Sequence, residues 1–274
     1  MSDRYAVIGN PISQSKSPLI HASFAKATQQ DLEYGSIEGP LDGFADAVRA
    51  FQRSGGRGMN VTAPFKLQAF ELATQCSQRA QLAGAANALK FEADDRILAE
   101  NFDGIGLVND IVRNLGAPIA GKRVLVLGAG GATRGLLLPF LAERPAELVI
   151  ANRDATKAAQ LARQFVAHGR IRGGGYSDIG PGRFDLVCNA TSASLRAELP
   201  PVAPAAFAID GLAYELAYGK GLTPFLRLAQ GAGVTRLADG VGMLVEQAAE
   251  AFVWWRGVRP ETRALIEQLT IALK

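Results

Sequence analysis

The sequence is poor in cysteine, in long apolar runs and in excess charge of either sign. It has two cysteines, Cys76 and Cys188, in 274 residues, so we expect neither a disulfide framework nor a metal site. The longest apolar stretches, such as residues 136–141, are far shorter than the ~18 residues of a membrane-spanning helix. The net charge is +3, and the basic residues are scattered, which argues against a nucleic-acid-binding surface. No secretory signal is visible, so we expect a cytoplasmic protein without a membrane partner.

The composition is typical of a globular protein, with 48% hydrophobic and 20% charged residues. The chain is long enough for two domains. Short β-branched runs alternate with amphipathic stretches. Because parallel strands need crossover helices, this alternation predicts an α/β protein built from parallel βα units. We place the break between two such units near Asn101–Gly106. The two closing helical patterns, residues 241–255 and 260–273, could belong to either unit.

A glycine-rich segment, residues 128–133, directly follows an apolar strand pattern and directly precedes a helical one. In dinucleotide-binding folds the first glycine permits a tight turn and the second lets the backbone approach a pyrophosphate. The following helix N-terminus then offers free N–H groups to the anion. A plain strand–helix turn would look similar, and Thr133 stands where a third glycine is usual. The strand, glycine loop, helix and strand together favour nucleotide binding.

The end of the next strand pattern indicates which dinucleotide is bound. NAD sites carry a carboxylate there, whereas this chain has Asn152 and Arg153, with Lys157 one turn into the following helix. A guanidinium can pair with a 2′-phosphate, so the pattern favours NADP. Asp154 would repel that phosphate, but its position suits a helix N-cap.

The first half of the chain carries polar motifs at expected strand ends and helix starts. We expect Ser17 to cap a helix that has Pro18 at its first position. Ser15 and Ser17 would then present two hydroxyls and free backbone N–H groups to a small carboxylate. Lys66 follows a strand pattern and a proline turn, where α/β proteins place ligands. A lysine at a helix start is usually only solvated, but paired with Asp103 in one cleft it would suit proton transfer.

In their order these motifs resemble the shikimate dehydrogenase family over essentially the whole chain. The matching segments are Gly9-Asn10-Pro11, Ser15-Lys16-Ser17-Pro18, Asn60-Val61-Thr62, Pro64-Phe65-Lys66, Gly84-Ala85-Ala86-Asn87, Asp103-Gly104, Gly128-Ala129-Gly130-Gly131-Ala132, Asn152-Arg153, Asn189-Ala190-Thr191-Ser192, Thr223-Pro224-Phe225 and Asp239-Gly240-Val241-Gly242-Met243-Leu244.

The resemblance implies NADPH-dependent, reversible reduction of 3-dehydroshikimate to shikimate in aromatic amino acid biosynthesis. For the assembly we expect a monomer or a homodimer. It also implies a split α/β substrate domain, residues 1–103 plus 240–274, and a Rossmann-like, doubly wound NADP domain, residues 104–239. The closing helices would then pack back onto the first domain.

Site residues follow from the same resemblance. Lys66 would be the acid/base at the carbonyl or hydroxyl group, and Asp103 would orient it and bind a substrate hydroxyl. The implied substrate-binding residues are Ser15, Ser17, Thr62, Asn87, Tyr218 and Gln247. The implied cofactor-binding residues are Gly128, Ala129, Gly130, Gly131, Ala132, Asn152, Arg153, Lys157, Thr191, Ala213, Gly240 and Met243.

Three residues depart from the family pattern. Phe102 replaces a threonine beside Asp103 and could narrow the substrate pocket, so we expect Phe102→Thr to leave activity equal or higher. Asp154 replaces a threonine and reopens the cofactor choice, and Glu215 stands where aspartate is common. Two alternatives therefore remain: a quinate/shikimate dehydrogenase using NAD, or an NADPH-binding paralogue with weakened catalysis. The paired serines and the lysine–aspartate pair do not fit a third class, the methylenetetrahydrofolate dehydrogenases.

Overall fold

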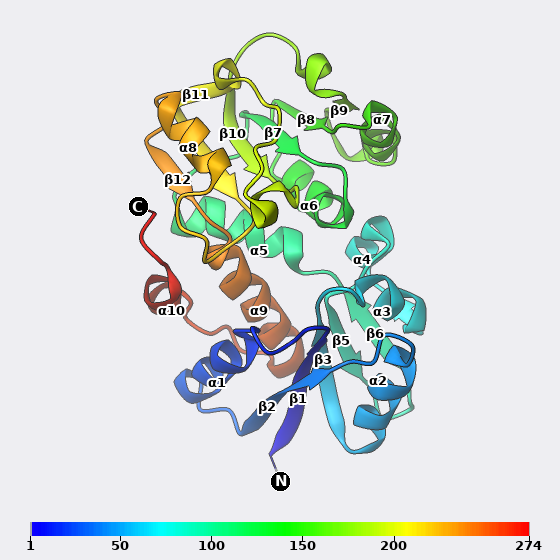
Figure 1. Cartoon of the computed structure of the whole chain (residues 1–274). Coiled ribbons are helices and arrows are strands. Elements are labelled where there is room, and N and C mark those ends of the chain that lie inside the picture. The colour runs from blue at the N-terminus through cyan, green and yellow to red at the C-terminus, as the bar shows by residue number, and fades with distance from the viewer. Residues whose placement is uncertain (1, 274) are drawn as a thin grey trace. The chain divides into compact units, whose positions relative to one another are not determined.

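The computed structural model describes residues 2–273, apart from the side chain of Leu195, and contains two six-stranded sheets with helices beside them (Figure 1). The chain divides into two compact units, Met1–Gly106 with Val245–Glu267, and Leu107–Leu244 with Gln268–Lys274. The predicted α/β class with two domains is confirmed. The functions assigned to residues 1–103 plus 240–274 and to 104–239 stay predictions, and their end residues, Met1 and Lys274, lie outside the described residues.

The first unit contains a mixed sheet in the order β2-β1-β3-β5-β6-β4. Its strands are β1 (Asp3–Gly9), β2 (Leu32–Glu38), β3 (Gly56–Val61), β4 (Gln75–Cys76), β5 (Ala88–Phe91) and β6 (Ile97–Glu100). β1 pairs in parallel with β2 and β3, but β5 is antiparallel to both β3 and β6. The expectation of parallel βα units is wrong for this half of the sheet, because two four-residue strands form a hairpin and need no crossover helix.

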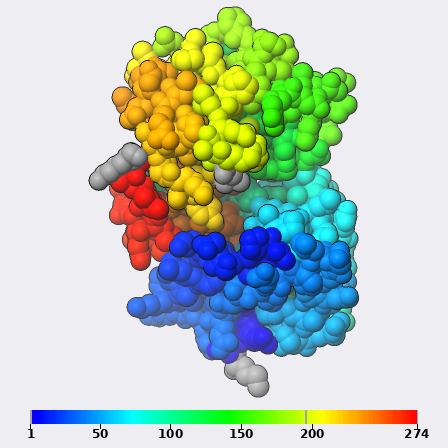
Figure 2. Space-filling model, viewed as in Figure 1, coloured from blue at the N-terminus to red at the C-terminus, as the bar shows by residue number. Residues whose placement is uncertain are grey.

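Helices cover both sides of this sheet. They are α1 (Ser17–Ala27), α2 (Phe44–Arg53), α3 (Lys66–Leu72), α4 (Gln78–Ala83), the start of α5 (Asp103–Asn109), most of α9 (Val241–Arg256) and most of α10 (Arg263–Leu269). One core cluster includes Ile8, Met59, Phe65 and Leu89. In the space-filling view, the visible surface of this unit comes mainly from the first 100 residues, coloured blue to cyan (Figure 2).

The second unit contains a fully parallel sheet in the order β12-β11-β10-β7-β8-β9. Its strands are β7 (Arg123–Leu127), β8 (Glu147–Ala151), β9 (Ile171–Gly174), β10 (Phe184–Asn189), β11 (Phe207–Glu215) and β12 (Arg236–Ala238). Its helices are α6 (Gly131–Ala142), α7 (Ala155–Arg163) and α8 (Pro224–Gly231). Five short helical turns complete the described elements of this unit: η1 (Asp110–Asn114), η2 (Val166–His168), η3 (Tyr176–Ile179), η4 (Ala193–Arg196) and η5 (Pro204–Ala206). Strands β7 and β8 are almost entirely buried, as expected where helices lie on both faces of a parallel sheet.

The strand order of the second sheet is that of a doubly wound dinucleotide-binding fold. Counted within the unit, the strands run 3-2-1-4-5-6, and the order reverses between β7 and β10. Ligands of such sheets bind at the carboxyl ends of the strands beside this reversal. The loops that follow Leu127 and Asn189 are therefore the expected ligand-binding segments. Among the described residues, no helix is long and apolar enough to cross a membrane.

Candidate active site

Lys66 and Asp103 form an ion pair in the first unit. Each is the first residue of its helix, α3 and α5 respectively, and Lys66 Nζ lies 2.6 Å from Asp103 Oδ2. A carboxylate is favoured at a helix N-terminus and an ammonium is disfavoured there, so the position of Lys66 is stabilised by the aspartate. The Lys66 side chain is 34% exposed and that of Asp103 is 12% exposed. The ammonium is therefore accessible to a substrate, while the carboxylate is largely buried.

The second oxygen of Asp103 is also engaged. Asn87 Nδ2 donates to Asp103 Oδ1 at 2.8 Å and to Gln247 Oε1 at 3.2 Å. Asn87 Oδ1 accepts from the Phe102 backbone N–H at 2.8 Å, which fixes the direction of the amide. The Asp103 N–H donates to Asn101 Oδ1 at 3.1 Å. The structure thus brings four of the predicted residues, Lys66, Asp103, Asn87 and Gln247, into one hydrogen-bonded cluster.

The paired serines lie at the start of α1, but not as expected. The predicted N-cap role of Ser17 is wrong: the helix begins at Ser17, the N-cap position is Lys16, and no side chain caps it. Instead Ser15 Oγ accepts from the Ser17 backbone N–H at 3.3 Å. Ser17 is 7% exposed and Ser15 is half-buried. Thr62, at the end of β3, is likewise half-buried.

Phe102 is buried, with 4% of its surface exposed. It packs with Ala88 and Ala251, and its ring meets that of Trp254 edge-on with centroids 5.7 Å apart. The Arg79 guanidinium lies 5.7 Å from the ring centroid. The ring is therefore part of the packed interior of the first unit, a role that the comparison of motifs did not indicate.

In the second unit, the glycine loop has the conformation that its sequence predicts. Gly128 has φ +104°, a conformation that residues with side chains rarely adopt. Thr133 is fully buried and its hydroxyl donates to the Gly128 carbonyl at 2.9 Å, so it closes the loop in place of a third glycine. At Gly130 and Gly131 an added Cβ would meet nothing. The start of α6 is thus open to a ligand that needs backbone N–H groups.

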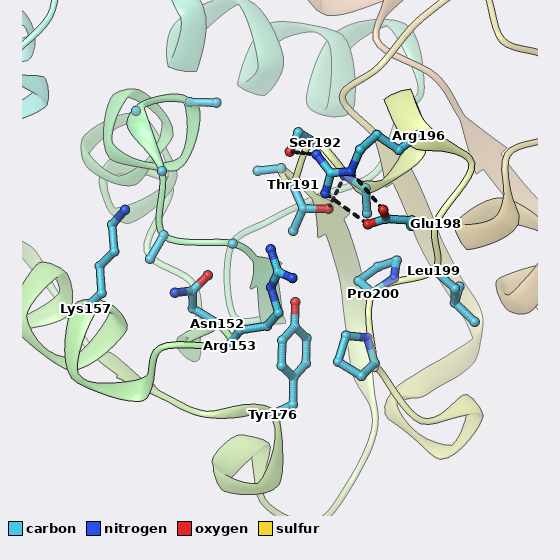
Figure 3. A pocket seen from close by; sticks show the side chains of 18 residues that line it. Asn152, Arg153, Lys157, Tyr176, Thr191, Ser192, Arg196, Glu198, Leu199 and Pro200 are labelled. Carbon is cyan, nitrogen blue, oxygen red and sulfur yellow. Dashed lines mark hydrogen bonds and ion pairs between the residues drawn. The ribbon is translucent and has the colours of Figure 1, made fainter.

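This loop lines a cavity of about 340 Å³ within the second unit. The predicted residues that line the cavity are Gly128, Ala129, Gly130, Gly131, Ala132, Asn152, Arg153, Lys157 and Thr191. The Arg153 guanidinium and the Tyr176 hydroxyl point into it (Figure 3). Lys157 lies on α7 at one side of the same view.

Asp154 caps α7. Its Oδ1 accepts from the Lys157 backbone N–H at 3.0 Å, as expected for an N-cap carboxylate. Asp154 is not among the residues that line the cavity. The cations Arg153 and Lys157 therefore dominate this end of the cavity, and with the open helix N-terminus they fit a dinucleotide that carries a 2′-phosphate.

Sequence reasoning missed several lining residues, among them Tyr176, Arg196 and Glu198. Arg196, at the end of η4, pairs with Glu198 through two contacts of 2.9 Å and donates to Ser192 Oγ at 3.1 Å (Figure 3). The ion pair with Arg196 is the largest influence lowering the pKa of Glu198, and the charge of Arg153 lowers it further. These residues come from irregular segments without periodicity, so no sequence pattern could have located them.

A buried carboxylate holds the loop that follows β10. Asn189 Oδ1 accepts from the Thr191 hydroxyl at 2.7 Å, and Asn189 Nδ2 donates to Glu215 Oε2 at 2.9 Å. Ser194 and Thr223 also donate to Glu215 Oε2. Burial raises the pKa of Glu215, while these hydrogen bonds lower it in part. Glu215 thus fixes the backbone that carries Thr191 into the cavity.

The other predicted residues of the second unit lie outside this cavity. Ala213 is fully buried in β11, and Tyr218 is 41% exposed in the loop after that strand. Gly240 precedes α9, and the Met243 N–H donates to Tyr214 Oη at 3.2 Å. Among the described residues, no group of three or more His, Cys, Asp or Glu side chains could hold a metal ion.

Three family models match the chain in order. Residues 7–89 match the shikimate dehydrogenase substrate binding domain, residues 110–195 match shikimate / quinate 5-dehydrogenase, and residues 240–270 match the shikimate 5′-dehydrogenase C-terminal domain. A curated relative, shikimate dehydrogenase (NADP(+)) of Nitrosospira multiformis, is 55% identical over 273 residues, which cover 100% of this chain and 99% of the relative.

Solved structures are also similar. An Ael1 enzyme from Pseudomonas putida is 65% identical, covers 100% of both chains and has a TM-score of 0.95. A shikimate 5-dehydrogenase from Thermus thermophilus, in complex with NADP(H) and shikimate, is 30% identical over 97% of both chains with a TM-score of 0.83.

Proposed function

This chain belongs to the shikimate dehydrogenase family, and from that premise we propose that it catalyses the reversible, NADP-dependent reduction of 3-dehydroshikimate to shikimate. It is then an oxidoreductase of aromatic amino acid biosynthesis that acts on a small molecule. The observation that carries its catalytic assignment is the contact between Lys66 and Asp103.

Lys66 is the proton donor and acceptor in this proposal. When bound, NADPH supplies a hydride to the carbonyl carbon of the substrate. Lys66 Nζ gives a proton to the carbonyl oxygen, and in the reverse direction it takes the proton from the hydroxyl group. Asp103 holds the ammonium in place through Oδ2, and Asn87 holds Asp103 through Oδ1.

Substrate binding is assigned to side chains around this pair. Ser15 and Ser17 are proposed to bind the carboxylate, since their hydroxyls lie at the N-terminus of α1, where an anion is favoured. Thr62, Asn87 and Gln247 are proposed to bind ring hydroxyls. Tyr218, Ala213, Gly240 and Met243 keep the roles that the family resemblance implies, as predictions.

Cofactor binding is assigned to the cavity of the second unit. The N–H groups at Gly130 to Ala132 would receive the pyrophosphate, and Arg153 and Lys157 would receive the 2′-phosphate. Asn152 and Thr191 also line the cavity. Asp154 caps the helix through Oδ1 and is not among the residues that line the cavity, which weighs against the NAD-dependent alternative, where a carboxylate would hold the ribose.

Initial rates measured by nicotinamide absorbance test the proposal. Shikimate and quinate are each assayed with NADP⁺ and NAD⁺, and 3-dehydroshikimate is assayed with NADPH. We expect the highest kcat/KM for shikimate with NADP⁺. A preference for NAD⁺ or quinate would favour the alternative enzyme, and NADPH binding without turnover would favour a non-catalytic paralogue. Assembly as a monomer or homodimer and a cytoplasmic location stay predictions.

A further inference from the structure

Tyr176 lines the cavity of the second unit, but neither the family motifs nor the proposed function gives it a role. It begins η3, the helical turn that follows β9 after one residue. The backbone N–H of Asn152, at the end of β8, donates to the carbonyl of Gly174, at the end of β9, at 3.1 Å. The residues just beyond these strand ends, Arg153 and Tyr176, therefore lie at the same edge of the parallel sheet, where such sheets bind ligands.

The turn that carries Tyr176 is fixed by hydrogen bonds. Arg172 donates to the backbone carbonyls of Asp178 and Ile179 at 2.7 and 2.6 Å. Asp178 Oδ2 accepts from the backbone N–H of Gly175 at 2.7 Å. The ring of Tyr176 packs against the core cluster of the second unit. The protein itself thus sets the position of the ring before a ligand binds.

The hydroxyl of Tyr176 makes no hydrogen bond to any other residue that the structure describes, whereas the phenol of Tyr214 donates to Asp110 Oδ2 at 2.7 Å. It points into the cavity beside the guanidinium of Arg153 (Figure 3). Burial raises the pKa of the Tyr176 phenol, and the charge of Arg153 lowers it in part. The phenol therefore keeps its proton at neutral pH and has it free to donate to a ligand.

We propose that Tyr176 binds the 2′-phosphate of NADP together with Arg153, and that its hydroxyl thereby adds to the preference for NADP over NAD. The inference rests on the proposed function, which assigns Arg153 to this phosphate. A phosphate group offers three strong acceptor oxygens, and a guanidinium paired with it in the bidentate mode uses two of them. A neutral donor held beside the guanidinium can take the third oxygen without repelling it.

Tyr176→Phe isolates the hydroxyl, because the ring and its packing against the core remain. Ser177→Ala is a matched control. It removes a hydroxyl from the next residue of η3, which is exposed and is not among the residues that line the cavity. Dissociation constants are measured by isothermal titration calorimetry with two ligands, adenosine 2′,5′-bisphosphate and AMP, which differ only by the 2′-phosphate.

We expect Tyr176→Phe to weaken binding of the bisphosphate about tenfold, the effect of one hydrogen bond to a charged group, and to leave the Kd for AMP unchanged. Ser177→Ala should match the wild type with both ligands. In steady-state kinetics, Tyr176→Phe should raise the KM for NADP⁺ by the same factor, while kcat and the KM for shikimate stay at their wild-type values.

An unchanged Kd for the bisphosphate in Tyr176→Phe would overturn the inference. Equal losses with the bisphosphate and AMP would overturn it as well, because the phenol would then contact a part that both ligands share. If Tyr176→Phe does not fold, as its melting temperature would show, Tyr176→Leu also lacks the hydroxyl and the same outcomes decide. A wild type that binds the bisphosphate no more tightly than AMP would overturn the proposed NADP dependence first, and the inference with it.

Discussion

Lys66 Nζ lies 2.6 Å from Asp103 Oδ2, although 37 positions separate the two residues in the chain. Each side chain stands at the first residue of a helix, and those helices follow different parts of the sheet. Asn87 donates to the other oxygen of Asp103, so one carboxylate oxygen has a hydrogen bond that does not depend on the ammonium. This makes the contribution of Lys66 separable by mutation from that of the rest of the site.

Phe102→Thr should destabilise the protein. The ring is buried against Ala88, Ala251 and Trp254, and its removal leaves a cavity and places a hydroxyl in it. We expect the free energy of unfolding to fall by roughly 2–4 kcal/mol, measured by denaturant titration, with Phe102→Leu losing less. Unchanged stability in Phe102→Thr would show that the ring is not part of the core. The family motifs led us to expect that Phe102→Thr leaves activity equal or higher, and this expectation applies to the activity per folded molecule.

Arg153→Ser should change cofactor choice. A hydrogen bond to a charged group contributes enough for the KM for NADP⁺ to rise ~10–100-fold, while the KM for NAD⁺, which lacks the 2′-phosphate, should change little. Steady-state kinetics with both cofactors measure this. Arg163→Ser, on an exposed position of α7, is the control and should match wild type. An equal rise in the KM for NADP⁺ and for NAD⁺ would mean that Arg153 contacts a part of the cofactor that both molecules share.

Glu198→Gln should strengthen binding of NADPH. The carboxylate lines the cavity, close enough to Arg153 for that charge to help lower the pKa of Glu198, and it would repel a phosphate dianion. Because exposed ion pairs contribute little, losing the pair with Arg196 should cost little. We expect the Kd for NADPH, measured by fluorescence titration, to fall ~2–5-fold. Glu143→Gln, at the half-buried C-cap of α6, is the control and should leave the Kd unchanged. Weaker binding would mean that the ion pair organises the cavity wall.

His21 should make stability depend on pH. Burial lowers its pKa from the ordinary 6.5 to about 3, so the folded protein keeps the ring neutral while the unfolded chain takes up a proton below pH 6.5. Stability is therefore lost as the pH falls from 6.5 toward 3, by about 2 kcal/mol between pH 7 and pH 5.

His21→Phe tests this expectation because the stack of this ring on Tyr34, with centroids 4.1 Å apart, can remain while the titrating group is removed. Urea denaturation at pH 7 and pH 5 should show a smaller loss in the variant than in the wild type, and carboxylate contributions cancel in the comparison. Equal losses in both proteins would mean that His21 is not kept neutral by burial.

The second unit could be predicted well because its signals are local. The turn at Gly128 requires a glycine, and the strand before it and the helix after it are continuous patterns. Asp154 likewise caps the helix that it directly precedes. Such features depend on a few neighbouring residues, which a single sequence shows.

Features of the first unit were harder to predict because they depend on distant residues. The β5–β6 hairpin uses four-residue strands that are too short to show alternation. Ser17 has the residue type of a cap, but the helix begins one position earlier than a cap would allow. The burial of Phe102 depends on Trp254, more than 150 positions away, and the contact of Tyr34 with Asn60 crosses the sheet.

The turnover of Lys66→Ala with saturating shikimate and NADP⁺ tests the central claim most directly. Removal of a general acid/base should lower kcat ~10²–10⁴-fold, with a much smaller change in KM. Lys90→Ala, a β5 lysine paired loosely with Glu92 at 3.8 Å, should keep wild-type turnover. A variant of Lys66 that retains kcat while its KM for shikimate rises steeply would contradict the account, because Lys66 would then bind substrate without moving the proton.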